Sequence, residues 1–104
     1  MPQLDIYANE DPASREIIPF LLDIQHALHS DLGTRLVIPL VRGVPQRQCI
    51  PRLCLSFSIG SEELTLSTPE MGAYPVANLG GKVGSLSHRR SEILAAIDFL
   101  HSGF

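Results

Sequence analysis

Apolar and small polar residues alternate along residues 53–59, where leucine, phenylalanine and isoleucine occupy every second position. This period of two is typical of a strand that buries one of its faces. Gly60-Ser61 comes next, and Leu64 and Leu66 continue the alternation after it. We therefore expect a hairpin in which both strands direct their large apolar side chains toward the same core.

Four shorter segments also have the composition of strands, and they cover residues 4–7, 20–24, 35–38 and 76–79. Residues 35–38 are rich in β-branched side chains and continuous enough to be buried on both faces, which predicts the central strand. Pro39 cannot donate to a ladder, so it is expected to mark a bulge or a strand end. Turn-forming residues predict loops over residues 8–15, 42–51 and 69–75, and a turn at Gly80-Gly81.

Residues 86–104 form the one long stretch without proline or an interior glycine. Ser87 is placed to cap a helix N-terminus, and Gly103 stands where a helix C-terminus favours a residue free to adopt positive φ. Apolar residues at helical spacing predict one packed face, made of Leu86, Ile93, Ile97, Leu100 and Phe104. We expect a single amphipathic helix, whose apolar last residue is either docked or used in binding.

Short strands followed by one helix predict a mainly β fold with one C-terminal α-helix. The antiparallel sheet is expected to be small and twisted or barrel-like, with the helix packed on it. At 104 residues the chain is long enough to fold around one core without staples. We find no internal repeat and no linker, so residues 1–104 are expected to be a single domain.

The charge balance argues against several classes of partner. The formal net charge is -3 with a pI near 5.7, and lysine and arginine together number only 8. Such cations supply most of the affinity for a nucleic-acid backbone, so direct nucleic-acid binding is not expected. No apolar run approaches the roughly 20 residues of a membrane span, and the first residues do not resemble a secretory signal. We expect a cytoplasmic protein with no membrane partner.

The two cysteines, Cys49 and Cys54, are expected to remain reduced, as is usual in the cytoplasm. Together with His26 and His29 they would complete a Cys2His2 zinc set, but neither spacing is one that zinc modules favour. The sequence therefore predicts no metal site and no other cofactor.

Familiar catalytic motifs are not matched. Residues 80–85 resemble a phosphate-binding loop around Lys82 only faintly, because the Gly-x-x-x-x-Gly-Lys-Ser/Thr pattern is absent. There is no serine nucleophile elbow and no His-Glu-x-x-His motif, and the carboxylates are scattered. His88 falls in the first helical turn beside two arginines, where we expect a neutral imidazole hydrogen-bonded to the sheet. No catalytic site is predicted from these residues.

Five blocks of the sequence together resemble the CcdB toxins of toxin–antitoxin modules. They are Asp23-Ile24-Gln25, the stretch from Gly33 to Leu40, the stretch from Met71 to Val76, and Leu86-Ser87-His88-Arg89 with the terminal Gly103-Phe104. Their order and spacing agree with that family over residues 4–104. The resemblance implies an SH3-like barrel with a small inserted sheet, of the kind found in CcdB and MazF toxins, and a two-fold homodimer.

The resemblance also implies a function. A CcdB toxin binds the A subunit of DNA gyrase and traps its complex with cleaved DNA, so such a protein is a topoisomerase poison and not an enzyme. A cognate antitoxin with a disordered acidic tail wraps the dimer and neutralises it.

In this family the gyrase contacts lie on the last helical turn and the free C-terminus. Carried over by position, they are Asp98, His101, Ser102, Gly103 and Phe104, with Leu28 and His29 beside them. The best-known members end in Phe-Trp-Gly-Ile, whereas this chain ends in His-Ser-Gly-Phe, so Ser102 stands in place of a tryptophan.

Two alternative functions stay open. MazF-like toxins share the fold but cut RNA, and the residues here that can supply an acid, a base and a phosphate clamp are Arg35, Thr34, His26 and His29. Their spacing does not require that activity, and the acidic composition argues against affinity for RNA. The altered C-terminal end also permits a degenerate toxin that is retained as a sink for antitoxin.

Overall fold

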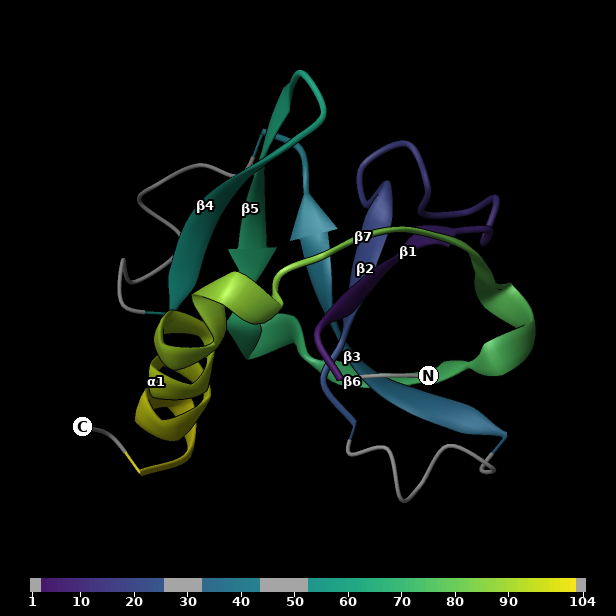
Figure 1. The fold of residues 1–104 in the computed structure, drawn as a ribbon. Helices are drawn as coiled ribbons and strands as arrows, with labels where there is room; N and C mark the ends of the chain where they lie inside the picture. Colours follow the sequence, from purple (N-terminus) through teal and green to yellow (C-terminus); the bar gives the residue numbers. More distant parts are fainter. Residues whose placement is uncertain (1–2, 26–32, 44–52, 103–104) are drawn as a thin grey trace.

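The computed structural model describes residues 3–25, 33–43 and 53–102, and within them the chain forms a seven-stranded sheet and one α-helix. The strands are β1 (Asp5–Asn9), β2 (Phe20–Asp23), β3 (Thr34–Val41), β4 (Cys54–Ile59), β5 (Glu62–Ser67), β6 (Gly72–Pro75) and β7 (Leu79–Ser85). Their order is β4-β5-β3-β2-β1-β7, with antiparallel neighbours, and β6 pairs with β3 beside this path. The sheet curls into an open half-barrel flanked by α1 (Arg90–Ser102), as Figure 1 shows. The expected mainly β fold with one C-terminal helix is confirmed.

The hairpin predicted from the alternating residues is present. β4 and β5 pair along their whole lengths, with Phe57 opposite Leu64. Both of these side chains are buried, whereas Ser56 on the other face of β4 is exposed. Gly60 in the connecting turn has φ +64°, a conformation that glycine adopts without a steric penalty.

β3 is central, as expected, but it differs from the prediction in two respects. It continues through Pro39 without a break. On one side of β3, β6 pairs with residues 34–37 and β5 pairs with residues 40–41, so neither strand pairs with Pro39. The missing N–H of the proline therefore breaks no ladder hydrogen bond on that side. Leu36 is 38% exposed, so the expectation of burial on both faces is wrong at that position.

The segment after β5 departs most from the sequence prediction. Residues 72–75, expected as loop, form β6 against β3, and residues 76–78, expected as strand, form a 3-10 turn. Gly80-Gly81 lies inside β7 and not in a turn, because β1 supplies a pairing partner there. The β1–β7 ladder has two register shifts, which is where glycine within a strand is commonly found. A Cβ on Gly80 would lie 2.7 Å from Glu10 Oε2, so a larger residue would displace that side chain.

The helix begins later than the predicted cap. A 3-10 turn over Ser87–Arg89 precedes α1, so Ser87 lies within this turn and is not the N-cap residue of the turn. Leu86 takes that N-cap position. In the part of the chain that the structure describes, no helix has both the length and the apolar character needed to span a membrane.

The packed face of α1 is shorter than the predicted stripe. Ile93 and Ala96 are buried, and Ile97 packs partly against the core, but Leu100 is 39% exposed. Figure 1 shows the reason, since the last turns of the helix extend beyond the sheet. Phe104, the predicted end of the stripe, lies outside the described residues.

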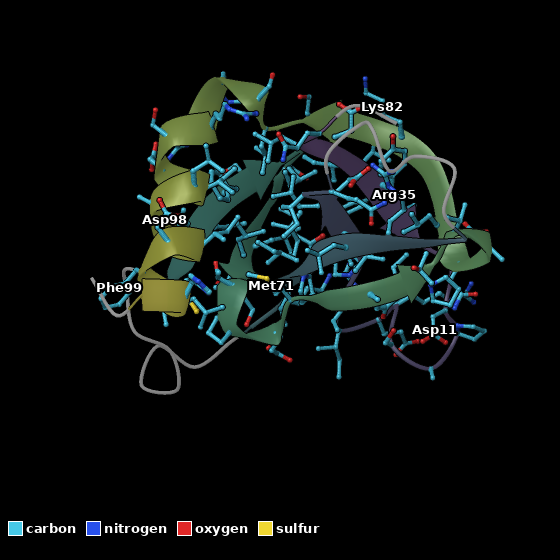
Figure 2. The ribbon with its side chains drawn as sticks, turned by 90° about the horizontal axis from the view of Figure 1, so that it is seen from below. Asp11, Arg35, Met71, Lys82, Asp98 and Phe99 are labelled. Atoms are coloured by element: carbon cyan, nitrogen blue, oxygen red, sulfur yellow. The ribbon has the colours of Figure 1, made fainter. Side chains whose placement is uncertain are left out.

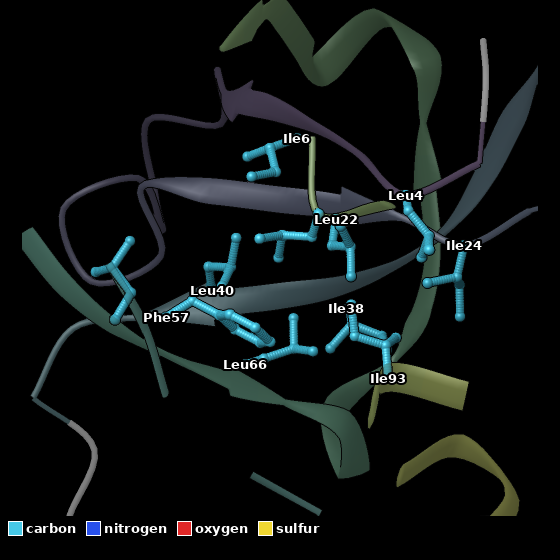
Figure 3. Close-up of a cluster of buried hydrophobic side chains, with 11 residues drawn as sticks. Leu4, Ile6, Leu22, Ile24, Ile38, Leu40, Phe57, Leu66 and Ile93 are labelled. Atoms are coloured by element: carbon cyan, nitrogen blue, oxygen red, sulfur yellow. The ribbon is translucent and has the colours of Figure 1, made fainter. Parts of the chain in front are cut away.

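The apolar core fills the inside of the curled sheet, and the base of α1 closes one side of it (Figure 3). Its buried members are Leu4, Ile6, Leu22, Ile24, Ile38, Leu40, Phe57, Leu64, Leu66, Leu86 and Ile93. Burying each such side chain contributes about 1.5–3 kcal/mol. The start of the helix is therefore tied to strands from both halves of the sequence.

Cys54, at the start of β4, is disulfide-bonded, which corrects the expectation of reduced thiols. The only other cysteine in the sequence is Cys49, which lies outside the described residues. The expectation rested on an assumed compartment, whereas a disulfide depends on whether the backbone brings two sulfur atoms together.

Candidate functional site

The predicted contact residues begin on the end of α1 that is distant from its packed base. Asp98 and His101 are both exposed and lie one turn apart on the helix, and Ser102 is its last residue. Figure 2 shows Asp98 and Phe99 on the α1 side of the molecule, away from Arg35 and Lys82. The first part of the predicted site is thus carried by a regular helix that extends past the sheet.

Four of the predicted contact residues lie outside the described part of the chain, namely Leu28, His29, Gly103 and Phe104. Their position relative to Asp98 and His101 stays a prediction. Leu100 was placed in the core by its helical spacing, but its exposure adds an apolar side chain to the exposed end of the helix. Periodicity identifies a helix face and does not indicate where the supporting sheet ends.

A buried ion pair lies where β2 ends. Asp23 and Arg35 are each 0% exposed, and Arg35 donates to Asp23 Oδ2 through Nε at 3.1 Å and through Nη2 at 2.6 Å. Taking two charges out of water is costly unless they are paired and hydrogen-bonded, and here they are. The sequence prediction did not identify this pair. Its only signal was one acidic and one basic residue inside two otherwise apolar strands.

The ion pair is bonded to Gln25, the last residue described before position 33. Asp23 Oδ1 accepts from the Gln25 backbone N–H at 3.0 Å, and Arg35 Nη2 also donates to the Gln25 carbonyl at 3.3 Å. The backbone N–H of Leu36 donates to Gln25 Oε1 at 2.9 Å. Two strands therefore fix both the backbone and the side chain of Gln25.

Tyr7, which shares β1 with Asp5, interacts electrostatically with the Asp23–Arg35 ion pair. Tyr7 Oη lies 3.5 Å from Asp5 Oδ2, and Lys82 Nζ lies 3.4 Å from the same oxygen. Burial raises the pKa of Tyr7 above its ordinary value, the carboxylates of Asp5 and Asp23 raise it further, and Arg35 opposes them. The raised pKa favours the neutral form of the Tyr7 hydroxyl.

A groove of about 450 Å³ lies between β4, β7 and the 3-10 turn before α1. Its polar lining includes Ser56, Ser58, Ser85, His88 and Arg89. Arg89 hydrogen-bonds to Glu92, which lowers the pKa of that carboxyl, and its guanidinium lies 4.8 Å from the centroid of the Phe57 ring. The arginine of the groove is thus already held by a carboxylate and an aromatic ring.

His88 is exposed at this groove, so the expectation that the sheet holds its imidazole is wrong. The cause is the 3-10 geometry of residues 87–89, which replaces the helical turn that the prediction assumed. Lys82 likewise belongs to β7 and pairs across to Asp5, so it does not lie in a phosphate-binding loop.

Of the residues considered for RNA cleavage, the structure describes Thr34 and Arg35, and these two differ in exposure. Arg35 is fully buried against Asp23, whereas its neighbour Thr34 is exposed. His26 and His29 lie outside the described residues, as does Cys49 of the zinc set considered above. Within the described ranges, no three His, Cys, Asp or Glu side chains gather closely enough to hold a metal ion.

A family model described as CcdB protein matches residues 3–103 of this chain. The match spans the curled sheet and α1 and includes all of the predicted contact residues except Phe104. The chain therefore belongs to the CcdB family, whose members are toxins of toxin–antitoxin modules.

Proposed function

We propose that this protein is a poison of DNA gyrase, which binds the A subunit and traps the enzyme on cleaved DNA. The family match over residues 3–103 carries the proposal. The proposed contacts on the helix and the chain end are Asp98, His101, Ser102, Gly103 and Phe104, and those after β2 are Leu28 and His29. The chain acts by binding and not by catalysis.

The arrangement of α1 supports this use. A few anchor residues that enter a preformed pocket supply most of the energy of a protein interface. Ile93 and Ala96 fix the base of the helix in the core, while Asp98 and His101 are exposed near its end. A rigid support of this kind presents its end without a large loss of conformational entropy on binding.

The proposal includes two protein partners besides gyrase. One is a second copy of the chain, which forms a two-fold homodimer, and the other is an antitoxin whose disordered acidic tail neutralises the toxin. Ile17, Leu36 and Val83 are large apolar side chains on the described surface, and such residues favour protein contacts when they are gathered in a patch. The toxin acts in the cytoplasm, where gyrase and its DNA are found.

Ribonuclease activity is the less supported function. A phosphate clamp needs guanidinium donors that point to solvent, but Arg35 has no exposed surface and donates to Asp23 and Gln25. The use of Arg35 in the fold therefore argues against its use on RNA.

The proposed function is tested by incubating the purified protein with gyrase, ATP and supercoiled plasmid, then denaturing the enzyme. We expect linear plasmid to accumulate with wild-type gyrase and not with gyrase that carries a resistant A subunit. Expression in two bacterial strains that differ only in this subunit provides the matched test in cells. Equal killing of both strains would exclude gyrase as the target, and cleavage of purified RNA that Arg35→Ala abolishes would favour the ribonuclease.

A further inference from the structure

We propose that the groove between β4 and β7 is a docking site for an extended acidic peptide of a partner protein, which adds a strand to the open edges of the half-barrel. The groove lies at the start of α1, where His88 and Arg89 line it. Asp98 and His101 of the proposed gyrase contacts lie near the other end of that helix. The inference therefore concerns a second surface and does not depend on the proposed function.

Two open sheet edges line the groove. β4 pairs only with β5 and β7 only with β1 among the strands that the structure describes, so each has one edge without a strand partner. Residues 56–60 line the groove from the β4 side, and residues 83–86 line it from the β7 side. Alternate residues of an edge strand direct N–H and C=O groups away from the sheet. An extended peptide is the ligand that pairs with such a row of backbone groups.

Small side chains leave room for a second backbone to approach these edges. The strand residues that line the groove include Gly84 together with Ser56, Ser58 and Ser85. Glycine within a strand commonly marks a place where a ligand or another backbone comes close. A Cβ on Gly84 would lie 3.7 Å from Ile6 Cδ1, an ordinary van der Waals contact, so core packing alone does not require glycine there. The missing side chain keeps the groove open beside β7.

The lining also suits the alternating faces of a strand. Successive side chains of an extended peptide point in opposite directions, so every second one can face the groove while the others face solvent. Apolar residues of the peptide would contact the apolar part of the lining, and polar residues would remain near its rim. The apolar lining consists of Ile6, Phe57, Ile59, Val83 and Leu86.

The charge of the groove selects an acidic peptide. The chain has a net charge of -3, yet none of the described residues that line the groove is acidic, and His88 and Arg89 are basic. Glu92 compensates Arg89, but the adjacent Arg90 is exposed and forms no ion pair within the described ranges. Complementary charge favours the encounter with one kind of partner and suppresses others. Carboxylates of a bound strand would therefore be attracted to this end of the groove.

The test uses a synthetic eight-residue peptide in which valine alternates with glutamate. It is compared with a peptide that has lysine in place of glutamate, and with two peptides that are methylated on one or the other set of alternate backbone nitrogens. Methylation removes the donors that a ladder needs and leaves the side chains in place. Binding is measured by fluorescence anisotropy, and amide hydrogen exchange locates the bound peptide.

Two pairs of protein variants give matched controls. Gly84→Val narrows the groove, whereas Gly81→Val changes the same strand at a position where a Cβ would meet no atom within 4 Å. Arg89→Gln removes a charge from the lining, whereas Arg15→Gln removes one from an exposed position after β1. Circular dichroism checks the folding of each. If Gly84→Val does not fold, Gly84→Ala takes its place, and the methylated peptides need no variant at all.

We expect the glutamate peptide to bind the wild-type protein. Its dissociation constant should rise about tenfold or more when the nitrogens of at least one set are methylated, because ladder hydrogen bonds are lost. The lysine peptide should bind about tenfold more weakly, and so should the glutamate peptide to Gly84→Val. Arg89→Gln should weaken binding about threefold, as expected for one exposed ion pair. Gly81→Val and Arg15→Gln should bind as the wild type does.

The bound peptide should slow amide exchange in residues 56–60 and 83–86. No slowing in either range would overturn the inference, and so would equal affinity for the unmethylated and both methylated peptides. Equal binding of the lysine peptide would reject the acidic partner. Loss of peptide binding as the protein dimerises, followed by light scattering, would show that a second copy fills the groove and would also overturn the inference. None of these measurements requires gyrase, so failure of the proposed function would leave their interpretation unchanged.

Discussion

At the residue scale, Arg35 shows most clearly how a polar group inside the fold is stabilised. Its guanidinium is 0% exposed and depends on Asp23 for a compensating charge. If one member of such a pair is removed, the other remains as an uncompensated buried charge. The energetic effect of a substitution here is therefore set by the partner that stays behind.

Arg35→Met is expected to lower the free energy of unfolding by about 3–5 kcal/mol, because it leaves Asp23 charged and buried. Adding Asp23→Leu should recover most of that loss. Urea denaturation of the two single variants and the double variant provides the measurement. Losses that simply add in the double variant would show that the two side chains do not interact energetically.

Tyr7 is expected to make the protein sensitive to alkaline pH. Its folded-state pKa is raised above 10.0 by burial and by Asp5 and Asp23. Its contribution to stability is therefore complete below the unfolded pKa and is lost as the pH rises through the folded value. The free energy of unfolding should fall above about pH 10 in the wild type and less steeply in Tyr7→Phe. Parallel curves for the two proteins would contradict this.

Deletion of Gly103 and Phe104 is expected to abolish gyrase trapping without unfolding the domain. Both residues follow Ser102, the last position of α1, and the ends of a chain are where folds commonly tolerate truncation. Phe104 can contribute up to about 3 kcal/mol if it is fully buried on binding. Ser102→Trp, which restores the more familiar end, should strengthen trapping.

The deletion is measured by release of linear plasmid, with circular dichroism and antitoxin binding as controls. Undiminished trapping would move the gyrase contacts away from the chain end. Loss of folding would instead assign Phe104 to the core.

At the element scale, α1 combines a packed base with an exposed end. Ile93 and Ala96 are 0% and 1% exposed, whereas Leu100 is 39% exposed although it lies at helical spacing from them. The first part of the helix is therefore stabilised by the core, and the second part depends on its continuity with the first. This is the arrangement that a helix needs if its end is to enter a partner.

Ile93→Ala and Leu100→Ala form a matched pair that tests this division. Ile93→Ala should reduce the free energy of unfolding by about 2–5 kcal/mol, because it leaves a cavity in the core. Leu100→Ala should change stability by less than about 0.5 kcal/mol, as is usual for exposed positions. Chemical denaturation measures both, and similar losses would show that the helix is packed along its whole length.

At the scale of the whole molecule, the sheet is an open half-barrel whose path ends in the edge strands β4 and β7. Open edges with unpaired backbone groups favour association unless they are covered or charged. Ile17, Leu36 and Val83 add apolar surface. A second copy of the chain is the proposed means of covering part of this surface.

We therefore expect a homodimer at micromolar concentration. Size exclusion coupled to light scattering should give about twice the 11.4 kDa mass of one chain. Leu36→Lys and Val83→Lys introduce charge at two exposed apolar positions and would identify the face involved. A mass near that of one chain across the concentration range would contradict the dimer.

Local patterns of residues were enough to predict the elements whose signal is local. The alternation around Phe57 predicted the β4–β5 hairpin, and the apolar spacing around Ile93 predicted the helix, because side-chain direction follows directly from the period of the backbone. The family resemblance over most of the chain was also visible in the printed residues. The contact residues carried over from it stay predictions, since most lie outside the described part of the structure.

Tertiary structure alone decided the features that depend on a distant partner. Gly80-Gly81 became strand because β1 pairs with it, and Pro39 was accepted within β3 because neither β5 nor β6 pairs with that position. Leu100 is exposed because the sheet ends before the helix does. Asp23 and Arg35 meet because two strands lie side by side, a contact between residues apart in the chain that no local propensity encodes.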